Sequence, residues 1–239
     1  MSNPVNQSSE NSAGRVLTIP VGGRAAFEDA CVMAATDEDV RAAMIVLTGE
    51  GIGADSVEPG MPATLGALLV PVVAGLSGRI DDRTLELALA ADVRICDRDT
   101  TFALTAVTDS GSGQLPSDGG TQRLPRIVGP GLATDMLLTG RRITAEEVLR
   151  AGLVTEICPA GESKTRAEQL AKEIASHGKS AGRFAKEAVL KGADMPLEQS
   201  LRLEADLAIL LHTDPERAEG IDAFNGRRDP DFRQDDGSK

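Results

Sequence analysis

Hydrophobic residues fall along this chain in short continuous runs that alternate with helix-like segments. The run at residues 43–47 is apolar throughout and is bounded by Arg41 and Gly49, a pattern typical of a strand buried on both faces. The same kind of pattern predicts strands at 16–19, 68–74, 93–96 and 101–104, and helices at 24–36 and 84–91. Because strands and helices alternate, we expect an α/β domain with parallel strands.

From residue 118 onward the pattern becomes mainly helical. Thr144 and Glu147 have the spacing of a capping box, which predicts a helix that begins between them. A short strand is expected at 153–157, and helices at 166–175, 181–191, 197–211 and 214–225. The helix at 197–211 is apolar on more than one side, so we expect it to be buried in the domain or against another subunit.

Composition narrows the possible classes of ligand. Hydrophobic residues make up 41% of the 239 residues, with five Phe and no Trp or Tyr, so the core depends on aliphatic side chains. The 25 Lys and Arg and 37 Asp and Glu give a net charge of −12, which argues against nucleic-acid or membrane partners. A small anionic ligand held by a few local cations is not excluded.

Cysteine and histidine usage offers no metal or disulfide framework. The three cysteines are far apart and form no CxxC pair, and the two histidines are too few for a histidine-based cluster. No apolar run is long enough for a membrane span, and the polar N-terminus lacks the pattern of a signal peptide. We therefore expect a cytoplasmic protein with no metal.

Three longer motifs carry a family resemblance. They are LTGEGIGAD at 47–55, PVVAGLSG at 71–78 followed by LELALAADVRI at 85–95, and GGTQRLPRIVG at 119–129 followed by MLLTGRRITAEE and AGLV. Together they resemble the enoyl-CoA hydratase/isomerase family, also called the crotonase family, over roughly residues 43–232.

The resemblance implies a fold and a ligand. It implies a spiral core of ββα units at residues 15–160 and a helical trimerisation region at 161–228, between a disordered arm at 1–14 and a polar tail at 229–239. It also implies an acyl-CoA thioester as ligand and self-association as a trimer or a dimer of trimers. Coenzyme A would enter as part of the substrate, so no separate cofactor is expected.

The resemblance also assigns candidate site residues. The backbone amides of Ile52 and Arg83 match the two that bind the thioester oxygen, and Glu86 matches one of two catalytic glutamates. Such chemistry builds negative charge on the carbonyl oxygen, which amides at a helix start stabilise. Contacts to coenzyme A are implied for Ala54, Asp55, Arg227 and Arg228, although a solvated helix end explains the two arginines equally well.

The segment before Glu86 departs from the family pattern. Family members have a run of glycines there, whereas this chain has Ile-Asp-Asp-Arg-Thr at 80–84. Asp81 and Asp82 bring negative charge toward the place of an oxyanion. Arg83 either offsets that charge or forms a salt bridge with Glu86 three residues along the helix.

The second catalytic position also departs from the pattern. Counting forward from Phe102 places Ala106 where the family has its other glutamate. Asp109 is an alternative acid, although a turn role before Ser110 and Gly111 explains it as well. Only fifteen residues separate Asp55 from Pro71, so the wall of the acyl pocket is shorter than in the family.

Two interpretations follow from these motifs. In the first, the chain is an acyl-CoA-processing enzyme, a hydratase/isomerase-type lyase that stabilises an enolate with Glu86 as acid/base. In the second, it is a non-catalytic or repurposed crotonase-fold protein that binds acyl-CoA or serves assembly. The motifs support the first interpretation, and the departures at residues 80–84 and at Ala106 support the second.

Overall fold

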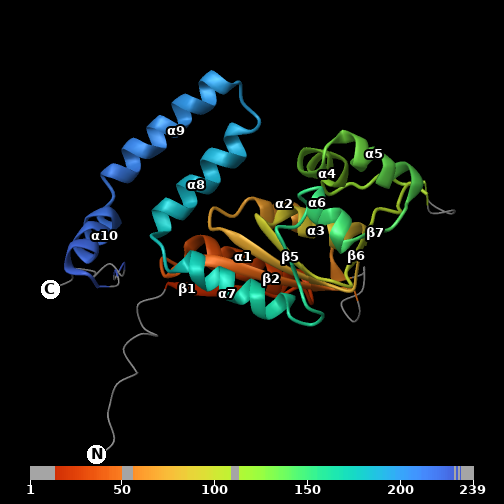
Figure 1. Cartoon of the computed structure of the whole chain (residues 1–239), viewed down its shortest axis with the longest axis horizontal. Helices are drawn as coiled ribbons and strands as arrows, with labels where there is room; N and C mark the ends of the chain where they lie inside the picture. The colour runs from red at the N-terminus through yellow and green to blue at the C-terminus, as the bar shows by residue number, and fades with distance from the viewer. Residues whose placement is uncertain (1–13, 50–55, 109–112, 229, 231, 233–239) are drawn as a thin grey trace, which may run out of the picture.

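The computed structural model describes residues 14–49, 56–108, 113–228, 230 and 232. The expected N-terminal arm and most of the expected C-terminal tail lie outside these residues. Within the described part, a five-stranded sheet, a three-stranded sheet and their covering helices form one body, and a further set of helices projects from it (Figure 1).

The larger sheet is entirely parallel. Its strand order is β1-β2-β3-β5-β8. The strands span Arg15–Ile19, Val40–Thr48, Val72–Ser77, Val93–Asp97 and Glu156–Cys158 respectively. Every connection is therefore a crossover, as parallel neighbours require.

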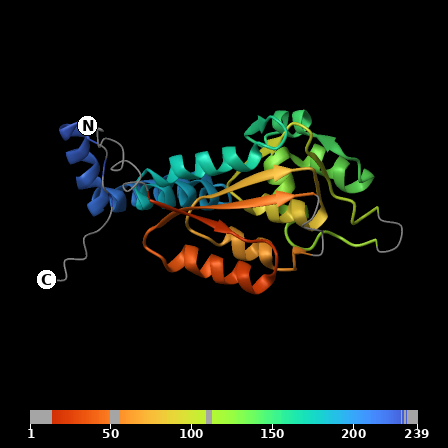
Figure 2. The ribbon, with the colours of Figure 1, turned by 90° about the horizontal axis from the view of Figure 1, so that it is seen from below.

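Helices cover both faces of this sheet. On β2, Ala43, Ile45 and Leu47 join the larger apolar cluster beneath α1 (Arg24–Thr36), α2 (Met61–Gly66) and α3 (Asp82–Ala90). The alternate residues Ala42 and Met44 join a second cluster under α7 (Ser163–Ala175). Because successive side chains of a strand point to opposite faces, both faces must be apolar. Figure 2 shows the strands between α1 and α7.

One glycine allows α7 to lie close to the sheet. A Cβ atom at Gly75 in β3 would lie 2.9 Å from the carbonyl oxygen of Ser163 and 3.2 Å from the Cβ of Ala167. The alanines of α7 that face the sheet, at 167, 171 and 175, are fully buried. Small residues on both surfaces therefore set this helix-to-sheet distance.

The smaller sheet continues strands of the larger one. After β3 the chain turns at Gly78 into β4 (Arg79–Asp81), and after β5 it turns into β6 (Thr101–Ala103). β4 and β6 pair in parallel, and β7 (Ile143–Thr144) pairs with β6 in antiparallel sense. Because α3 begins directly after β4, its N-terminus lies at the edge of this small sheet.

Three helices follow β6 and cover this end of the core. They are α4 (Gly120–Val128), α5 (Pro130–Thr139) and α6 (Ala145–Arg150). The capping box expected before α6 is confirmed, since Thr144 Oγ1 accepts from the Glu147 amide and the Glu147 carboxylate accepts from the Thr144 amide. α4 packs against α3, which brings residues near 118–120 beside Glu86.

The last three helices form an arm that extends away from the core (Figure 1). They are α8 (Lys179–Gly192), α9 (Leu197–His212) and α10 (Pro215–Gly226). No residue of α8 is buried, and Leu207 is the buried residue of α9. The expectation that 197–211 is buried within the domain is therefore wrong, and its apolar side chains lie on the surface of this arm.

Most predicted elements are confirmed, but two strands are shifted, and the one predicted at 153–157 spans Glu156–Cys158. The helix at Arg24–Thr36 and the helix beginning at Leu197 start where the pattern placed them. The strand predicted at 68–74 instead spans Val72–Ser77. Pro71 has no N–H to donate to a neighbouring strand, so the ladder begins after it.

Candidate active site

Glu86 lies in the middle of α3 with only 3% of its surface exposed. Its neighbours Leu85 and Leu87 are fully buried, so the helix presents almost no polar face to water. A carboxylate in such surroundings costs free energy unless hydrogen bonds compensate for its lost hydration. The partners of Glu86 therefore decide what this residue does.

Two backbone amides hold one oxygen of Glu86. Oε1 accepts hydrogen bonds from the amide of Asp118 over 2.9 Å and from the amide of Gly120 over 2.8 Å. Gly120 is the first residue of α4, and first-turn amides have no acceptor within their own helix. No described residue donates a hydrogen bond to Oε2, so the second oxygen is left for another molecule.

Gly120 is required by this contact. A Cβ atom there would lie 3.1 Å from Glu86 Oε1 and 2.8 Å from the Cβ of Pro116. Any side chain would therefore push the helix start away from the carboxylate. Gly119 is the N-cap residue of α4 and has a φ of 111°, a backbone conformation that favours glycine.

The environment of Glu86 favours its protonated form. Burial raises the pKa of Glu86 above its ordinary value, and the amide hydrogen bonds of Gly120 and Asp118 act in the opposite direction. The negative charges of Asp118 and Asp82 raise the pKa further. A carboxyl group with a raised pKa inside a buried site is suited to donate and accept protons.

The turn before Glu86 is braced by its two aspartates. Asp81 accepts two hydrogen bonds of 2.7 Å from the guanidinium of Arg142. Asp82 accepts from the amide and hydroxyl of Thr105, both over 2.7 Å, and from the amide of Ala106 over 3.1 Å. The carboxylates of Asp81 and Asp82 are therefore bound by other groups, although the charge of Asp82 still acts on Glu86.

Asp82 also adopts a backbone conformation that favours glycine. Its φ is +42°, one of two positive values among the described non-glycine residues. Asp is among the residues that tolerate this region, and three hydrogen bonds to its side chain hold it there. The side chain of Asp82 thus stabilises a turn conformation that glycine would adopt without strain.

Arg83 does not pair with Glu86. Its side chain is exposed, and the ion pairs among the described residues do not include it. The alternative of a salt bridge three residues along α3 is therefore wrong, because Glu86 points inward and Arg83 points out. The amide of Arg83 remains in the first turn of α3, where amides lack an intrahelical acceptor.

Several sequence-predicted site residues lie outside the described part of the chain. They are Ile52, Ala54, Asp55 and Asp109. Their roles stay predictions. Ala106 is described, and its amide binds Asp82, so the position expected for a second glutamate lies at the same turn but carries no acid.

The two arginines expected to contact coenzyme A lie far from Glu86 within one chain. Arg227 and Arg228 end α10, at the opposite end of the molecule from α4 (Figure 1). Arg227 is exposed, and Arg228 donates to the carboxylate of Glu219 over 2.5 and 2.9 Å. The chain does not bring this basic pair and Glu86 together.

Asp118 is a residue of the site that sequence reasoning missed. Beyond its amide bond to Glu86, its carboxylate accepts from the amide of Gly60 over 3.0 Å. Its position directly before the helix start at Gly119 could have indicated it, because acidic residues are favoured near helix N-termini, where backbone amides lack intrahelical acceptors. Asp118 also lines a cavity of about 470 Å³ together with Ala63, Ser117, Gln122 and Arg123.

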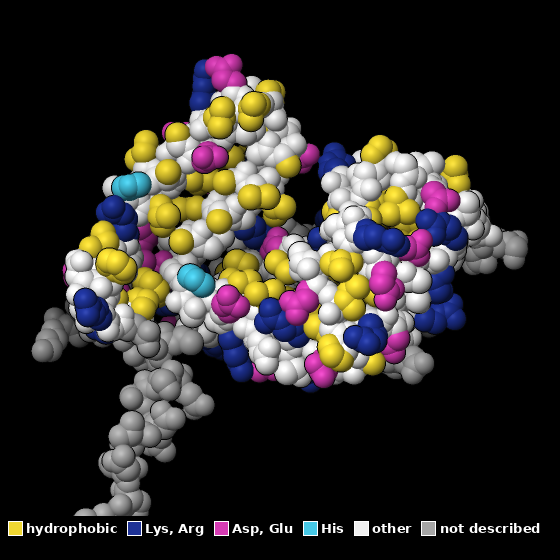
Figure 3. Space-filling view, viewed as in Figure 1, with side chains coloured by type: hydrophobic (Ala, Val, Ile, Leu, Met, Phe, Trp, Pro, Cys, Tyr) yellow, Lys and Arg dark blue, Asp and Glu magenta, His cyan; other side chains and the backbone are white. Residues whose placement is uncertain are grey.

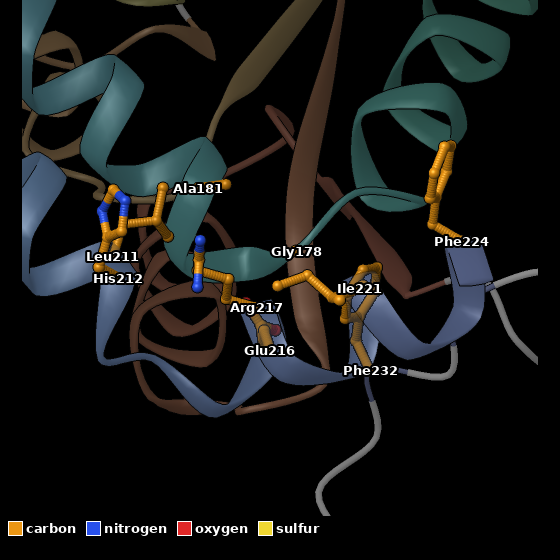
Figure 4. Close-up of a pocket in the computed structure, with 10 residues that line it drawn as sticks. Gly178, Ala181, Leu211, His212, Glu216, Arg217, Ile221, Phe224 and Phe232 are labelled. Atoms are coloured by element: carbon orange, nitrogen blue, oxygen red, sulfur yellow. The ribbon is translucent and has the colours of Figure 1, made fainter.

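A second cavity, of about 410 Å³, lies in the arm (Figure 4). Its lining combines Leu211, Ile221, Phe224 and Phe232 with Glu216. Glu216 is the acid of this lining, and its carboxylate already accepts hydrogen bonds from the amides of Lys179 and Ser180 at the start of α8. His212 and Arg217 also line this cavity, and Nδ1 of His212 lies 2.6 Å from the carbonyl oxygen of Ala208.

The described residues hold no group of three metal-ligating side chains close enough to share an ion. In the same part of the chain, no helix has the length and apolar character needed to cross a membrane.

A buried carboxyl group held by backbone amides at a helix start is a candidate site for acid–base chemistry. The sequence model of the enoyl-CoA hydratase/isomerase family matches residues 63–235. The chain belongs to this family.

Individual relatives agree with this assignment. The chain is 37% identical over 179 residues to 2,3-dehydroadipyl-CoA hydratase of Escherichia coli (strain K12), covering 75% of the chain and 69% of that relative. It is 38% identical over 163 residues to (E)-benzylidenesuccinyl-CoA hydratase of Thauera aromatica, covering 68% of the chain and 62% of that relative. The chain thus spans about two thirds of the length of these two proteins.

A solved structure agrees as well. The crystal structure of enoyl-CoA hydratase from Bacillus anthracis superposes with a TM-score of 0.77 at 29% identity, covering 86% of this chain and 87% of that one. The predicted crotonase-type α/β fold with a C-terminal helical region is therefore confirmed. The expectation of an acyl-CoA-processing enzyme family is confirmed too, and the non-catalytic alternative is not favoured.

Proposed function

We propose that the chain acts on an α,β-unsaturated acyl-CoA thioester through an enolate, with Glu86 as the acid/base. The observation that carries this proposal is the arrangement of Glu86, in which Oε1 is fixed by two amides and Oε2 has no partner among the described residues. A fixed orientation with one available oxygen suits transfer of a proton to or from a bound substrate or water.

The oxyanion would be stabilised next to this carboxyl group. The thioester oxygen gains negative charge as the enolate forms, and the Arg83 amide at the start of α3 is one of the two donors we propose, with the Ile52 amide as the other. Arg142 offsets the charge of Asp81, and hydrogen bonds from Thr105 and Ala106 stabilise the carboxylate of Asp82. Water addition and double-bond migration both pass through such an enolate.

Binding of coenzyme A would involve more than one copy of the chain. Because α10 lies at the far end of the molecule from α3, the contact we propose between Arg227 or Arg228 and a coenzyme A phosphate would come from a neighbouring copy. Self-association as a trimer, or a dimer of trimers, would also cover the apolar side chains of α8 and α9. We propose a cytoplasmic location for this assembly, in which the three buried free thiols would stay reduced.

The experiment is a turnover assay on the purified full chain. Crotonyl-CoA and a panel of longer or branched enoyl-CoAs would be followed by the absorbance of the conjugated thioester. Glu86→Gln keeps the size and the amide contacts but removes the base, so turnover should fall about 10²–10⁴-fold. Glu173→Gln, at an exposed position of α7, is the matched control and should keep full activity.

Undiminished turnover by a folded Glu86→Gln protein would remove Glu86 from the mechanism. Absence of turnover by the unmodified protein on the whole panel, with no heat on calorimetric titration with acyl-CoAs, would overturn the proposed function itself.

A further inference from the structure

Asp118 joins three segments of the chain around Glu86. Its amide donates to Glu86 Oε1 over 2.9 Å, and its Oδ1 accepts from the amide of Gly60 over 3.0 Å. Its carbonyl oxygen accepts from Nη1 of Arg123 over 2.8 Å. Because Gly60 caps α2 and Asp118 precedes α4, this one residue ties the starts of both helices to the carboxylate of α3.

Half of the Asp118 carboxylate has no partner. Oδ2 is buried and receives no hydrogen bond from any described residue. A buried carboxylate oxygen without a partner costs free energy, and most buried polar atoms in proteins are satisfied. The hydrogen bond from the amide of Gly60 at the start of α2 explains Oδ1, but it does not explain the cost at Oδ2.

We propose, on the basis of the proposed function, that Asp118 is a positioning residue for Glu86, whose side chain fixes the turn that holds this carboxyl group and supplies the second acidic group of the site. The second glutamate expected from the family pattern is absent, since Ala106 stands in its place. Asp118 therefore places an acidic group beside Glu86, but it does not take the place of the missing glutamate, because its Oδ1 is bound by Gly60 and its Oδ2 is buried.

The electrostatic surroundings of Glu86 support this role. Two negative groups act on it, Asp118 and Asp82, and both raise the pKa of Glu86. Asp82 is bound by three donors, whereas Asp118 has one bond at Oδ1 and none at Oδ2. α2 and β6, which also pack on α3, carry no charged residue.

Cations near this helix are directed elsewhere. The exposed Arg83 points away from Glu86, and Arg142 binds Asp81, which also lies 3.6 Å from Arg79. Arg123 of α4 donates to backbone carbonyls of Asp118 and Pro62. Removing the charge of Asp118 should therefore lower the pH at which Glu86 gives up its proton, because one of the groups that favours the protonated form is lost.

The test measures the titration of Glu86 directly. The full chain would be labelled with ¹³C at the glutamate carboxyl carbon, and the Glu86 resonance would be assigned by its loss in Glu86→Gln. Asp118→Asn keeps the shape and the acceptor for Gly60 but removes the charge. We expect its Glu86 midpoint to fall by about 0.5–1 pH unit, a three- to tenfold change in proton affinity.

Asp99→Asn is the matched control, because Asp99 is exposed at the turn between β5 and β6. It makes the same change in net charge and should leave the Glu86 midpoint in place. If Asp118→Asn fails to fold, Asp118→Ala is used instead. It also removes the Gly60 contact, and the Glu86 midpoint should again fall. The acid limb of kcat on crotonyl-CoA should move with the resonance.

A Glu86 midpoint that is unchanged or raised in a folded Asp118 variant overturns the proposal, even where thermal stability falls, since a purely structural residue would lower stability alone. The titration needs no turnover. Failure of the unmodified protein to use any enoyl-CoA would therefore count against the proposed function without affecting the result for Asp118.

Discussion

The core of this chain buries its apolar residues, whereas the C-terminal arm exposes many of them to solvent. In α3 every residue from Thr84 to Ala90 is buried, and β2 is buried along nearly its whole length. In the arm, α8 buries no residue, and large side chains such as Leu197 and Phe224 are 74% and 83% exposed. Figure 3 shows hydrophobic side chains gathered on the face of the arm that α8 and α9 form.

The contacts that join the arm to the core include polar ones. The arm is fastened to the core by lysines: Lys186 pairs with Asp92 over 2.7 Å, and Lys179 donates to the carbonyl oxygens of Asp37 and Glu38. Apolar burial is the main driving force of folding, and large exposed apolar patches are typical of protein–protein contact sites. The core therefore buries its apolar residues within one chain, whereas the arm leaves many of them exposed.

Truncation of a core aromatic should have the largest effect. Phe102 of β6 is fully buried, so Phe102→Ala should reduce the free energy of unfolding by about 3–5 kcal/mol through lost burial and a new cavity. Phe224→Ala removes the same side chain from an exposed position of the arm and serves as the control. Denaturant titration in dilute protein should show little change for Phe224→Ala; equal losses would erase the distinction between the regions.

Polar substitution on the arm should change association. Leu197→Ser with Leu201→Ser replaces two exposed apolar side chains of α9, which are 74% and 55% exposed. If these side chains are buried between copies, the loss should weaken association by about 2–4 kcal/mol per pair of side chains. Light scattering across the micromolar range should then show smaller particles with an unchanged core stability. An unmodified protein that is monomeric at all these concentrations contradicts this prediction.

The ion pair between the regions should have an intermediate effect. Lys186 and Asp92 have side chains only 8% and 18% exposed, so Lys186→Met leaves a mostly buried carboxylate without its cation. We expect a loss of about 1–3 kcal/mol in the free energy of unfolding. The control is Lys191→Met, whose partner is Glu187 on the surface of α8, where the change should stay within about 0.5 kcal/mol. Similar losses in both variants would mean that burial of the pair is unimportant.

The smallest expected effect is on the pH dependence of stability, and it comes from Glu86, a buried charged residue of the core. Burial raises the pKa of Glu86 in the folded protein, so the folded state binds this proton more tightly than the unfolded state. The resulting stability is fully present below the unfolded pKa and is lost as the pH rises through the folded pKa. Glu86→Gln, which cannot ionise, should therefore gain stability relative to the unmodified protein as the pH rises. Urea titrations on both sides of that range test it, and a constant difference would contradict it.

Local pattern was sufficient for elements whose residues carry their own signal. The continuous apolar run at 43–47 and the periodic helix at 24–36 need no distant contact to be recognised. The capping box at Thr144 and Glu147 is equally local, because both partners lie within one helical turn. Pro71 shows the limit of apolar pattern alone, since a missing N–H moved the start of β3 to Val72.

The register of Glu86 came from the motif at 85–95, but its partners came from the fold. The amides of Asp118 and Gly120 are 32 and 34 residues away in sequence, and no local rule favours them over Arg83 at three residues. The partners of Asp82 are also distant in sequence, because its carboxylate accepts hydrogen bonds from the amides of Thr105 and Ala106. The partners of Glu86 and Asp82 are therefore set by the packing of α3 against α4 and β6.

By itself, then, the sequence determined the alternation of strands and helices, the caps and the identity of the buried carboxylate, because periodicity, proline and capping act within a few residues. Only the tertiary structure decided that Glu86 is held by amides and not by a cation, that Arg142 and Thr105 bind the carboxylates of Asp81 and Asp82, and that the apolar side chains of α9 lie outside the core. These outcomes depend on which distant backbone groups are left without partners, and hydrogen-bond satisfaction is a property of the whole packed chain.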